Sequence, residues 1–452
     1  MVHGPNLFRQ LSQKKIENHP NLMKVLSNVG WLAFDRGFQL FTSFLIVVWV
    51  IRYLGPQQFG LLSYAAAFSG LFSAIAYLGI PNILIKELVH ADENKTYKIL
   101  GTAFVLLFVS GIIALLISLG AIILVNPGEL SVWLLVVFAS ASFIFYPFTV
   151  MASWFDSRVE SKFSVLSRNG VLVIACIIKI ILILTNSPLL YFAIEGFLES
   201  ILIGAFLAYF YFKQKQNIFA WRFDFEVAKN LLKSGAPLIL SGAAVLVYLR
   251  IDQVIIGHFL STFDVGIYAV AVKIAEFGGF IPGILIASLF PSIVMSKKNS
   301  EKLFISRFGK LYDFLVLTSF SIALIITLFS NQIIALLYGE AYSGAGIILS
   351  IYVWSIVPWF LSLAMNQYFV VDNKTIYSLY AALIGCVSNI LLNVLLIPLY
   401  GMPGAAVATV VSYSLVILST FLFKETRQHG FLILNSFNPI GVFSRLYKMI
   451  FS

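Results

Sequence analysis

Ten charged side chains lie inside long apolar segments of this 452-residue sequence. A charge at the centre of a bilayer costs about 2.5–3.5 kcal/mol even on a lenient scale, so such groups normally face a protein interior or a water-filled cavity. An arginine fork can bind phosphate oxygens in pairs, and burial together with a neighbouring carboxyl raises a carboxyl pKa enough for proton transfer. The ten are Asp35, Arg36, Arg168, Lys179, Glu195, Glu199, Arg250, Asp252, Lys273 and Glu276.

Depth along the segments separates the cations. At about 1.5 Å per helical residue, Arg250, Lys273 and Lys179 fall far from the ends of their segments. Arg36 is one or two turns from an end, where it can either reach the headgroups or meet an anionic ligand as it enters. These four cations are the candidate ligand-binding residues, with Arg168 more simply explained by headgroup contact.

The carboxylates suggest ion coupling or charge pairing. Glu195 and Glu199 are four residues apart on one predicted helix and would repel each other if both were ionised. They are candidates for proton carriers, for two inert protonated carboxyls, or for partners of Lys179. Asp35 lies next to Arg36 and is a further charge-pair candidate.

Two more pairs lie on neighbouring segments. Lys273 and Glu276 are three residues apart and share a helix face, so a salt bridge that only lowers the cost of insertion is an alternative to a binding role. Arg250 and Asp252 are about 200° apart on an ideal helix. We therefore expect Arg250 to face a cavity and Asp252 to hold a neighbouring helix or the helix end.

Uncharged side chains complete the candidate set. Asn393 and Asn389, four residues apart, could bind sugar hydroxyls or form hydrogen bonds between helices. Trp359, with Trp354 and Tyr352 nearby, could stack on sugar rings or only pack between helices. Asn393 and Trp359 are included among the candidate binding residues.

The segments that position these residues are membrane helices. The chain is 60% hydrophobic and 11% charged, with a mean hydropathy of +0.94, well outside the range of soluble domains. Runs of about 20 apolar residues each span a bilayer as a helix. Twelve spans are expected: 30–52, 60–85, 99–125, 130–155, 163–184, 189–212, 235–257, 264–294, 311–337, 345–370, 376–397 and 403–423.

Several classes of protein do not fit. The runs are apolar throughout rather than alternating, so the fold class is all-α and not a β-barrel. Cys176 and Cys386 fall inside spans, and neither a metal-ligand spacing nor a disulfide framework is present, so no cofactor is expected. The sequence has no phosphate-binding loop for ATP.

The distribution of Lys and Arg predicts the orientation. Loops of one parity, together with both termini, carry 24 cations, whereas the loops of opposite parity carry only Arg52. By the positive-inside rule both termini are cytoplasmic. The net charge of +10 is then a topology signal with a secondary attraction to anionic membrane lipid, and it does not indicate a nucleic-acid partner.

The two halves of the chain repeat each other. A shift of 214 positions places 161–183 on 375–397, and a shift of 206 places Leu62 opposite Tyr268. Six helices separate matching elements, so the halves are parallel six-helix bundles. The expected organisation is a cytoplasmic amphipathic lead-in (1–29), a first bundle (30–212), a basic cytoplasmic linker (213–233), a second bundle (234–424) and a cytoplasmic or interfacial tail (425–452).

Three stretches carry a family resemblance. "YLGPQQFGLLSYAAAF", "YLRIDQVIIGHFLSTFDVGIYAVAVKI" and "NILLNVLLIPLYGMPGAAVATVVS" resemble, in order and spacing, the oligosaccharide (O-antigen type) flippases. These belong to the multidrug/oligosaccharidyl-lipid/polysaccharide (MOP) exporter superfamily. The resemblance extends over essentially the whole chain.

The resemblance implies a function. It implies movement of undecaprenyl-pyrophosphate-linked oligosaccharide repeat units from the cytoplasmic to the periplasmic leaflet, by alternating access, for surface polysaccharide synthesis. It also implies the cytoplasmic (inner) membrane of a bacterium, a proton or sodium ion as the coupling ion, and polymerase or length-control proteins as partners.

Two other functions stay open at this point. One is export of a small molecule or drug by a member of the same superfamily. The other is an enzyme that acts on lipid-linked sugars, which the short outward loops disfavour because they offer few acidic or imidazole side chains. We expect a transporter and not an enzyme.

Overall fold

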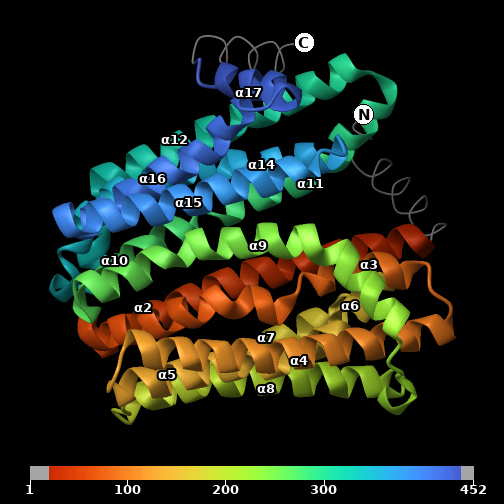
Figure 1. Cartoon of the computed structure of the whole chain (residues 1–452), viewed down its shortest axis with the longest axis horizontal. Helices are drawn as coiled ribbons and strands as arrows, with labels where there is room; N and C mark the ends of the chain where they lie inside the picture. Colours follow the sequence, from red (N-terminus) through yellow and green to blue (C-terminus); the bar gives the residue numbers. More distant parts are fainter. Residues whose placement is uncertain (1–19, 439–452) are drawn as a thin grey trace, which may run out of the picture. The chain divides into compact units, whose positions relative to one another are not determined.

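The computed structural model describes residues 20–438, apart from some side chains within that range. Helices follow one another along the whole described range, which contains no β-strand (Figure 1). Eleven helical segments in this range are long and apolar enough to cross a membrane. The expected all-helical membrane fold is therefore confirmed.

The first half of the described chain contains α2 (Pro20–Tyr77), α3 (Ile80–Val89), α4 (Glu93–Val125), α5 (Leu130–Ala141), η1 (Ser142–Phe148), α6 (Thr149–Ser157), α7 (Lys162–Leu184), α8 (Leu189–Lys213) and η2 (Ile218–Ala220). The second half contains α9 (Phe225–Phe259), α10 (Thr262–Phe277), α11 (Phe280–Asn299), α12 (Glu301–Tyr338), η3 (Glu340–Tyr342), α13 (Ala345–Tyr352), η4 (Val353–Ser355), α14 (Ile356–Val371), α15 (Thr375–Tyr400), α16 (Met402–Leu418), η5 (Ser419–Phe421) and α17 (Lys424–Asn435).

A break inside α2 explains why eleven segments are found where twelve spans are expected. The first segment, Gly37–Tyr77, takes in both of the first two expected spans. Gly55 within it has φ 67° and ψ 172°, and Pro56 follows. Glycine tolerates positive φ and proline has no N–H to donate, so this pair ends one helix and begins the next.

Prolines coincide with other breaks. Pro81 begins α3, Pro147 lies in the 3₁₀ turn η1, and Pro282 follows the break between α10 and α11. Pro358 lies in the first turn of α14, directly after the 3₁₀ turn η4. Proline cannot donate the hydrogen bond that would continue a preceding helix, which accounts for these interruptions.

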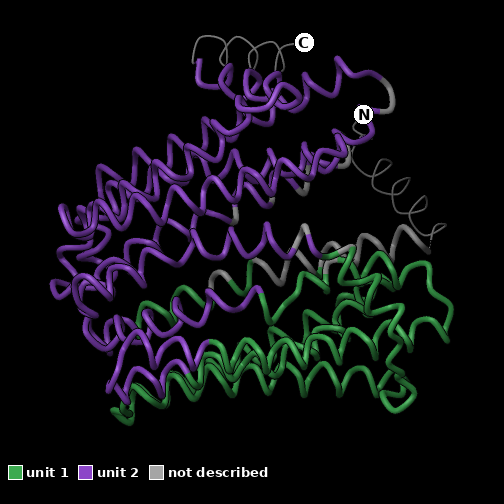
Figure 2. Tube along the Cα trace, in the orientation of Figure 1, with its two compact units in different colours: residues 1–50, 75–117, 137–235 green, residues 51–74, 118–136, 236–452 purple. Residues whose placement is uncertain are grey.

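The contacts divide the chain into two compact units (Figure 2). Unit 1 contains the chain up to Val50 together with 75–117 and 137–235. Its core gathers around aromatic residues, with the rings of Trp154 and Tyr211 5.1 Å apart. Both of these side chains are buried.

Unit 2 contains 51–74, 118–136 and the chain from Ala236 onward. Parts of the first half therefore pack with the second half. The expected bundles, 30–212 and 234–424, are defined by the internal sequence repeat, whereas the two units are defined by contacts within the structure. The two bundles therefore stay a prediction.

Within unit 2, Gly60 of α2 and Gly266 of α10 meet at a tight crossing. A Cβ added at Gly60 would lie 1.7 Å from the carbonyl oxygen of Thr262, and one at Gly266 would lie 2.1 Å from that of Pro56. The shift of 206 that relates the two halves makes these two glycines equivalent. The repeats thus contact each other backbone to backbone at matching positions, beside a hydrogen bond from Gln57 Nε2 to Thr262 Oγ1 of 2.8 Å.

Residues 51–52 of α2 also contact the C-terminal end of α12 and the turn η3 that follows it. The guanidinium of Arg52 donates to the carbonyl oxygen of Leu337 at 2.6 Å and also to that of Leu336. Tyr342 donates its hydroxyl to the carbonyl oxygen of Ile51 at 2.9 Å. Arg52 therefore caps a helix C-terminus, where a cation is favoured, and this explains the single cation in the loops of that parity.

Candidate functional site

Three accessible charged residues of unit 2 lie within candidate membrane spans, on α9 and α10. Arg250 Nη1 is 3.6 Å from Glu276 Oε1, and their side chains are 39% and 29% exposed. Lys273, three residues before Glu276 on α10, is also exposed. This group, the α9–α10 cluster, has one more cation than anion and is open to an incoming ligand.

A small recess lies beside this cluster. It is lined by Glu276, Tyr352, Ser355, Trp359 and Tyr413 among others. The hydroxyl of Tyr413 is buried and has no hydrogen-bond partner among the described residues. The recess has room for no more than about one water molecule, so in this structure it places aromatic residues next to Glu276 without forming a ligand pocket.

Asp252, two residues after Arg250, has different surroundings. It is 1% exposed and accepts a hydrogen bond from the Tyr268 hydroxyl at 2.6 Å. It also accepts one from the backbone N–H of Gln253 at 2.8 Å. Asp252 therefore joins α9 to α10, whereas Arg250 is accessible, as expected from their angular separation.

Three charged residues of unit 1 form a compact group between α7 and α8. Lys179 Nζ is 2.9 Å from Glu195 Oε1, and Glu195 is 3% exposed. The same ammonium is 3.7 Å from Glu199 Oε2, whose side chain is 34% exposed. This group, the α7–α8 cluster, holds two carboxylates on one cation and has the opposite net charge to the α9–α10 cluster.

Asn393 is not accessible in this structure. It is fully buried, and its Nδ2 donates to the backbone oxygen of Asn389 at 2.8 Å and to Asn389 Oδ1 at 3.1 Å. The amide pair lies in α15, remote in sequence from both ionic clusters. Both hydrogen bonds stay within α15 and join it to no other helix, so contact with sugar and bonding between helices both stay predictions.

Two candidates cannot be located. The backbones of Asp35 and Arg36 belong to α2, but their side chains lie outside the described residues. Their roles at the mouth of a cavity stay predictions.

Sequence reasoning missed some of the residues that complete these sites. Tyr268 is the partner of Asp252 across the α9–α10 hairpin, and Tyr413 comes from α16, distant in sequence. Glu276 pairs with Arg250, and no ion pair joins it to Lys273 among the described residues. No local signal in the sequence could identify contacts between separate helices.

The family assignment rests on a model described as polysaccharide biosynthesis protein, which matches residues 25–297, more than half of the chain. The chain belongs to the polysaccharide biosynthesis protein family. A second model, MatE, matches residues 237–395 of this family member. The resemblance to flippases of the MOP superfamily is confirmed.

Two curated relatives of this polysaccharide biosynthesis protein cover most of its length. "Probable flippase AglR" of Haloferax volcanii is 27% identical over 405 residues, which is 87% of this chain and 82% of the relative. "Putative O-antigen transporter" of Shigella flexneri is 22% identical over 329 residues, 71% of this chain and 78% of the relative. Both names describe flippases or transporters, not enzymes.

Solved structures share the fold. The inward closed conformation of the lipid II flippase MurJ has a TM-score of 0.68 at 16% identity, covering 91% of this chain and 90% of MurJ. An inward-facing multidrug resistance MATE transporter of the MOP superfamily has a TM-score of 0.71 at 15% identity, covering 90% and 98%. An outward-facing MATE structure has a TM-score of 0.52 at 14% identity, covering 91% and 96%.

Proposed function

We propose that this protein flips a lipid-linked oligosaccharide, carried on undecaprenyl pyrophosphate, from the cytoplasmic to the outer leaflet of a bacterial inner membrane. The observation that carries the proposal is the accessibility of the α9–α10 cluster. Arg250 is 39% exposed although it lies within a membrane-spanning helix. An accessible guanidinium group at this depth can bind a doubly charged phosphate group as it passes through the membrane.

The aromatic residues around the recess support a sugar-bearing ligand. Trp359 and Tyr352 line it beside Glu276, and aromatic faces combined with hydroxyl or carboxylate groups are the usual surroundings of a polar, ring-shaped ligand. The names of the relatives agree with a glycan cargo. Arg250 and Lys273 would hold the pyrophosphate, and Trp359 would contact the sugar.

Deletion of the gene tests the proposal. We expect lipid-linked oligosaccharide to accumulate on the cytoplasmic leaflet and surface polysaccharide to fall, because the carrier can no longer present its sugar outside. The matched controls are complementation by the wild-type chain, which restores both, and by Arg250→Ala at equal protein level, which does not. Unchanged leaflet distribution of the lipid-linked sugar after deletion would contradict the proposal.

The MatE match favours a second candidate, export of a small amphipathic molecule. The same deletion strain separates the two. Export would be indicated by greater sensitivity to toxic amphipathic cations together with a normal distribution of lipid-linked sugar. Flipping is indicated by the reverse pattern.

The mechanism proposed is alternating access, and the paired glycines support it. The crossing of Gly60 with Gly266 and the capping by Arg52 lie at the ends of spans that face outward in the predicted topology. They hold parts of both halves together on that side, as expected for a closed outer gate.

Cross-linking tests the gate. Gln57 and Thr262 lie side by side, so Gln57→Cys and Thr262→Cys joined by a short bifunctional thiosulfonate would hold the gate closed and stop flipping, with recovery on reduction. Thr185→Cys with Ser187→Cys is the matched control, because these side chains are also adjacent, at 2.8 Å, but belong to one predicted bundle. Full flipping with the first pair cross-linked would rule out gate opening.

The α7–α8 cluster is the proposed coupling site for a proton or sodium ion. Glu195 and Glu199 share one cation, Lys179, so a second positive charge would neutralise the group. Loading and release of that charge would couple the ion gradient to movement.

The orientation and the partners belong to the same proposal. Both termini are proposed to be cytoplasmic, so a Cys at Asp264 should react with an impermeant reagent from outside and one at Lys298 should not. The reversed labelling would overturn the topology. Polysaccharide polymerase and length-control proteins are the proposed partners, since they would use the flipped product.

A further inference from the structure

Three phenylalanines on the linker 213–233 are exposed. Phe219 is 91% exposed, Phe225 76% and Phe223 52%. Large apolar side chains that gather on a surface mark a binding site for a protein or a membrane. What this surface binds is therefore a question separate from the transported cargo.

The linker is held firmly against unit 1. Trp221 Nε1 donates to the Tyr211 hydroxyl at 3.1 Å, and the N–H of Arg222 donates to the carbonyl oxygen of Tyr97 at 3.3 Å. A Cβ on Gly101 would lie 2.7 Å from the backbone nitrogen of Arg222. The linker thus packs one aromatic residue inward while its phenylalanines stay outside.

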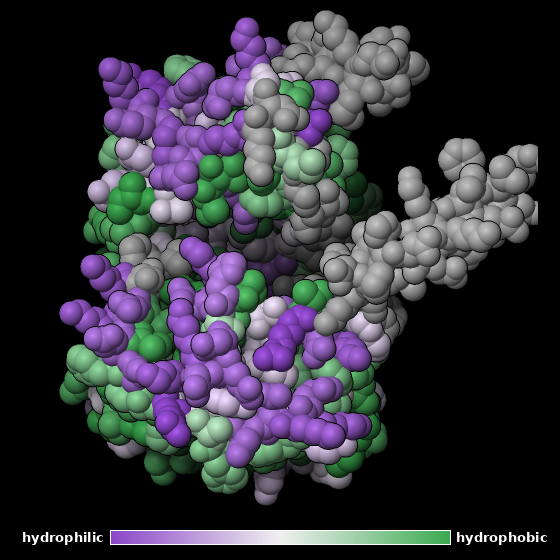
Figure 3. Space-filling model, turned by 90° about the vertical axis from the view of Figure 1, so that its right-hand side faces the viewer, coloured by the Kyte–Doolittle hydropathy of each residue, from purple (hydrophilic) through white to green (hydrophobic). Residues whose placement is uncertain are grey.

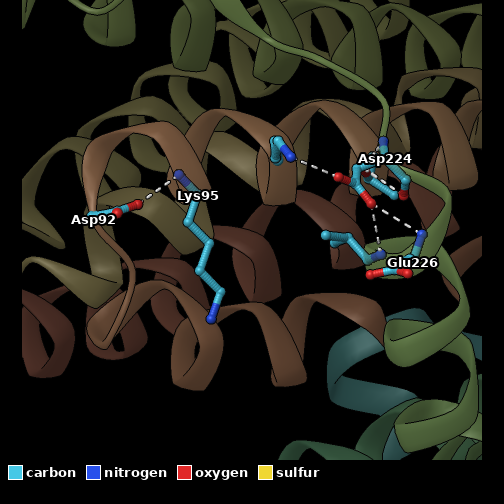
Figure 4. A network of polar contacts seen from close by, with 7 residues as sticks. Asp92, Lys95, Asp224 and Glu226 are labelled. Carbon is cyan, nitrogen blue, oxygen red and sulfur yellow. Dashed lines mark hydrogen bonds and ion pairs between the residues drawn. The ribbon is translucent and has the colours of Figure 1, made fainter.

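Asp224 fixes the linker at the point where α9 begins (Figure 4). Its carboxylate accepts the N–H groups of Glu226 at 3.0 Å and Val227 at 3.2 Å, capping α9. Lys98 Nζ on α4 pairs with the other oxygen at 2.9 Å, and this hydrogen bond lowers the pKa of Asp224. The exposure of the phenylalanines is therefore set by the fold.

Exposed cations surround the phenylalanines. The linker carries five of them against two acidic residues, and Figure 3 shows hydrophilic residues with hydrophobic ones among them in the lower part of this end of the molecule. The exposed rings continue onto the last turns of α8, where Tyr209 is 58% and Phe212 48% exposed. The five cations are Lys213, Lys215, Arg222, Lys229 and Lys233.

We infer that the linker is a docking surface for anionic phospholipid headgroups of the leaflet on which it lies, with Phe219, Phe223 and Phe225 inserted at the headgroup boundary. The linker directly follows α8, a candidate span that ends at Lys213, so the surface begins at membrane level. Aromatic rings favour the membrane interface, and Lys and Arg favour anionic lipid there. The excess of cations selects anionic over zwitterionic lipid.

A fluorescent probe on the reconstituted full-length protein tests this inference. The probe is attached at Phe219→Cys in a Cys176→Ala Cys386→Ala background, in vesicles of phosphatidylcholine alone or of phosphatidylcholine with phosphatidylglycerol, whose anionic headgroups give the vesicle surface a negative potential. Quenching by lipids brominated high in the acyl chain reports insertion. Asn94→Cys, exposed at the start of α4 beside two acidic residues, is the matched control.

We expect strong quenching at position 219 in the phosphatidylglycerol vesicles, weaker quenching without that lipid, and none at position 94. Replacing Lys213, Lys215 and Arg222 with Gln should weaken the phosphatidylglycerol effect by about fivefold per cation at low salt. The substituted side chains are exposed, so folding is checked simply by thermal melting.

Equal, water-like behaviour of the probes at 219 and 94 would overturn the inference. Protection of position 219 only after addition of cytosolic extract would also overturn it and would indicate a protein partner. Flipping is not the readout, so failure of this test leaves the proposed function untouched.

Discussion

The two ionic clusters use the same kinds of side chain in opposite ways. In the α7–α8 cluster, Lys179 is shared by two carboxylates, and Glu195 is almost completely buried. In the α9–α10 cluster, Arg250 pairs with a single carboxylate, that of Glu276, at the longer distance of 3.6 Å. The Arg250 side chain is 39% exposed. The first group has surplus negative charge and the second surplus positive charge.

This difference teaches that charge inside a membrane protein must be interpreted from its partners and not from its sign alone. A cation enclosed by two acids has no capacity left for an anionic ligand. An arginine with one distant partner keeps several donors free. We therefore propose anion binding for the α9–α10 cluster and ion coupling for the α7–α8 cluster, and contact of Lys179 with the ligand stays a prediction.

The largest expected effect comes from removing the free donors of the α9–α10 cluster. Arg250→Ala should lower the flipping rate by roughly 10- to 100-fold, because a hydrogen bond to a charged group contributes about 1.5–3 kcal/mol. Arg250→Lys should recover part of the loss, since it keeps the charge without the fork. The measurement is leaflet-resolved lipid-linked sugar at matched protein level, and wild-type rates in both Arg250→Ala and Lys273→Ala would remove the assignment.

The second-largest effect is expected from removing both carboxyls of the α7–α8 cluster. Glu195→Gln with Glu199→Gln should make flipping insensitive to an imposed pH gradient while leaving substrate binding intact, because no carboxyl is left to take up a proton. Flipping in proteoliposomes with and without the gradient measures this. If the double variant responds to the gradient as the wild type does, protons are carried elsewhere.

A smaller effect is expected on stability. Lys179→Met leaves the buried Glu195 without its cation, so the melting temperature in detergent should fall. The loss should stay below the about 3–5 kcal/mol typical of a fully buried pair, because Lys179 is 23% exposed. Adding Glu195→Gln should restore stability, and a failure of this rescue would mean that the pair is not the cause.

The smallest effect is expected at Asn393, which is fully buried and belongs to neither ionic cluster. Asn393→Ala should cost about 0.5–1.5 kcal/mol, the usual net contribution of a hydrogen bond within a protein, because it removes bonds that stay within α15. The flipping rate per folded molecule should not change, because Asn393 is fully buried. A selective fall in sugar binding at normal stability would instead place Asn393 in the substrate path.

The sequence was sufficient for much of the fold because a bilayer imposes a length and polarity on every helix. The apolar runs predicted the spans, and the shift of 206 between the repeats places Gly60 opposite Gly266. Periodicity also separated Arg250 from Asp252. These properties are local or follow from the internal symmetry of the chain.

The pairing of charges was not predictable in the same way. Contact of Glu195 and Glu199 with Lys179 was one of three alternatives that the sequence left open, and the packing of α7 against α8 brings these residues together. That Glu276 pairs with Arg250 and not with Lys273 depends on the α9–α10 hairpin. Side-chain partners across separate helices are set by packing geometry, which a single sequence does not encode in any local pattern.

The glycine crossing has a consequence for the cell's energy supply. A carrier with a wide polar interior would discharge the membrane potential if water and ions could leak through it between cycles. Backbone contact at Gly60 and Gly266 leaves no room even for a methyl group between the two helices. We therefore expect Gly60→Ala or Gly266→Ala to force the two helices apart and to raise the passive ion leak of proteoliposomes.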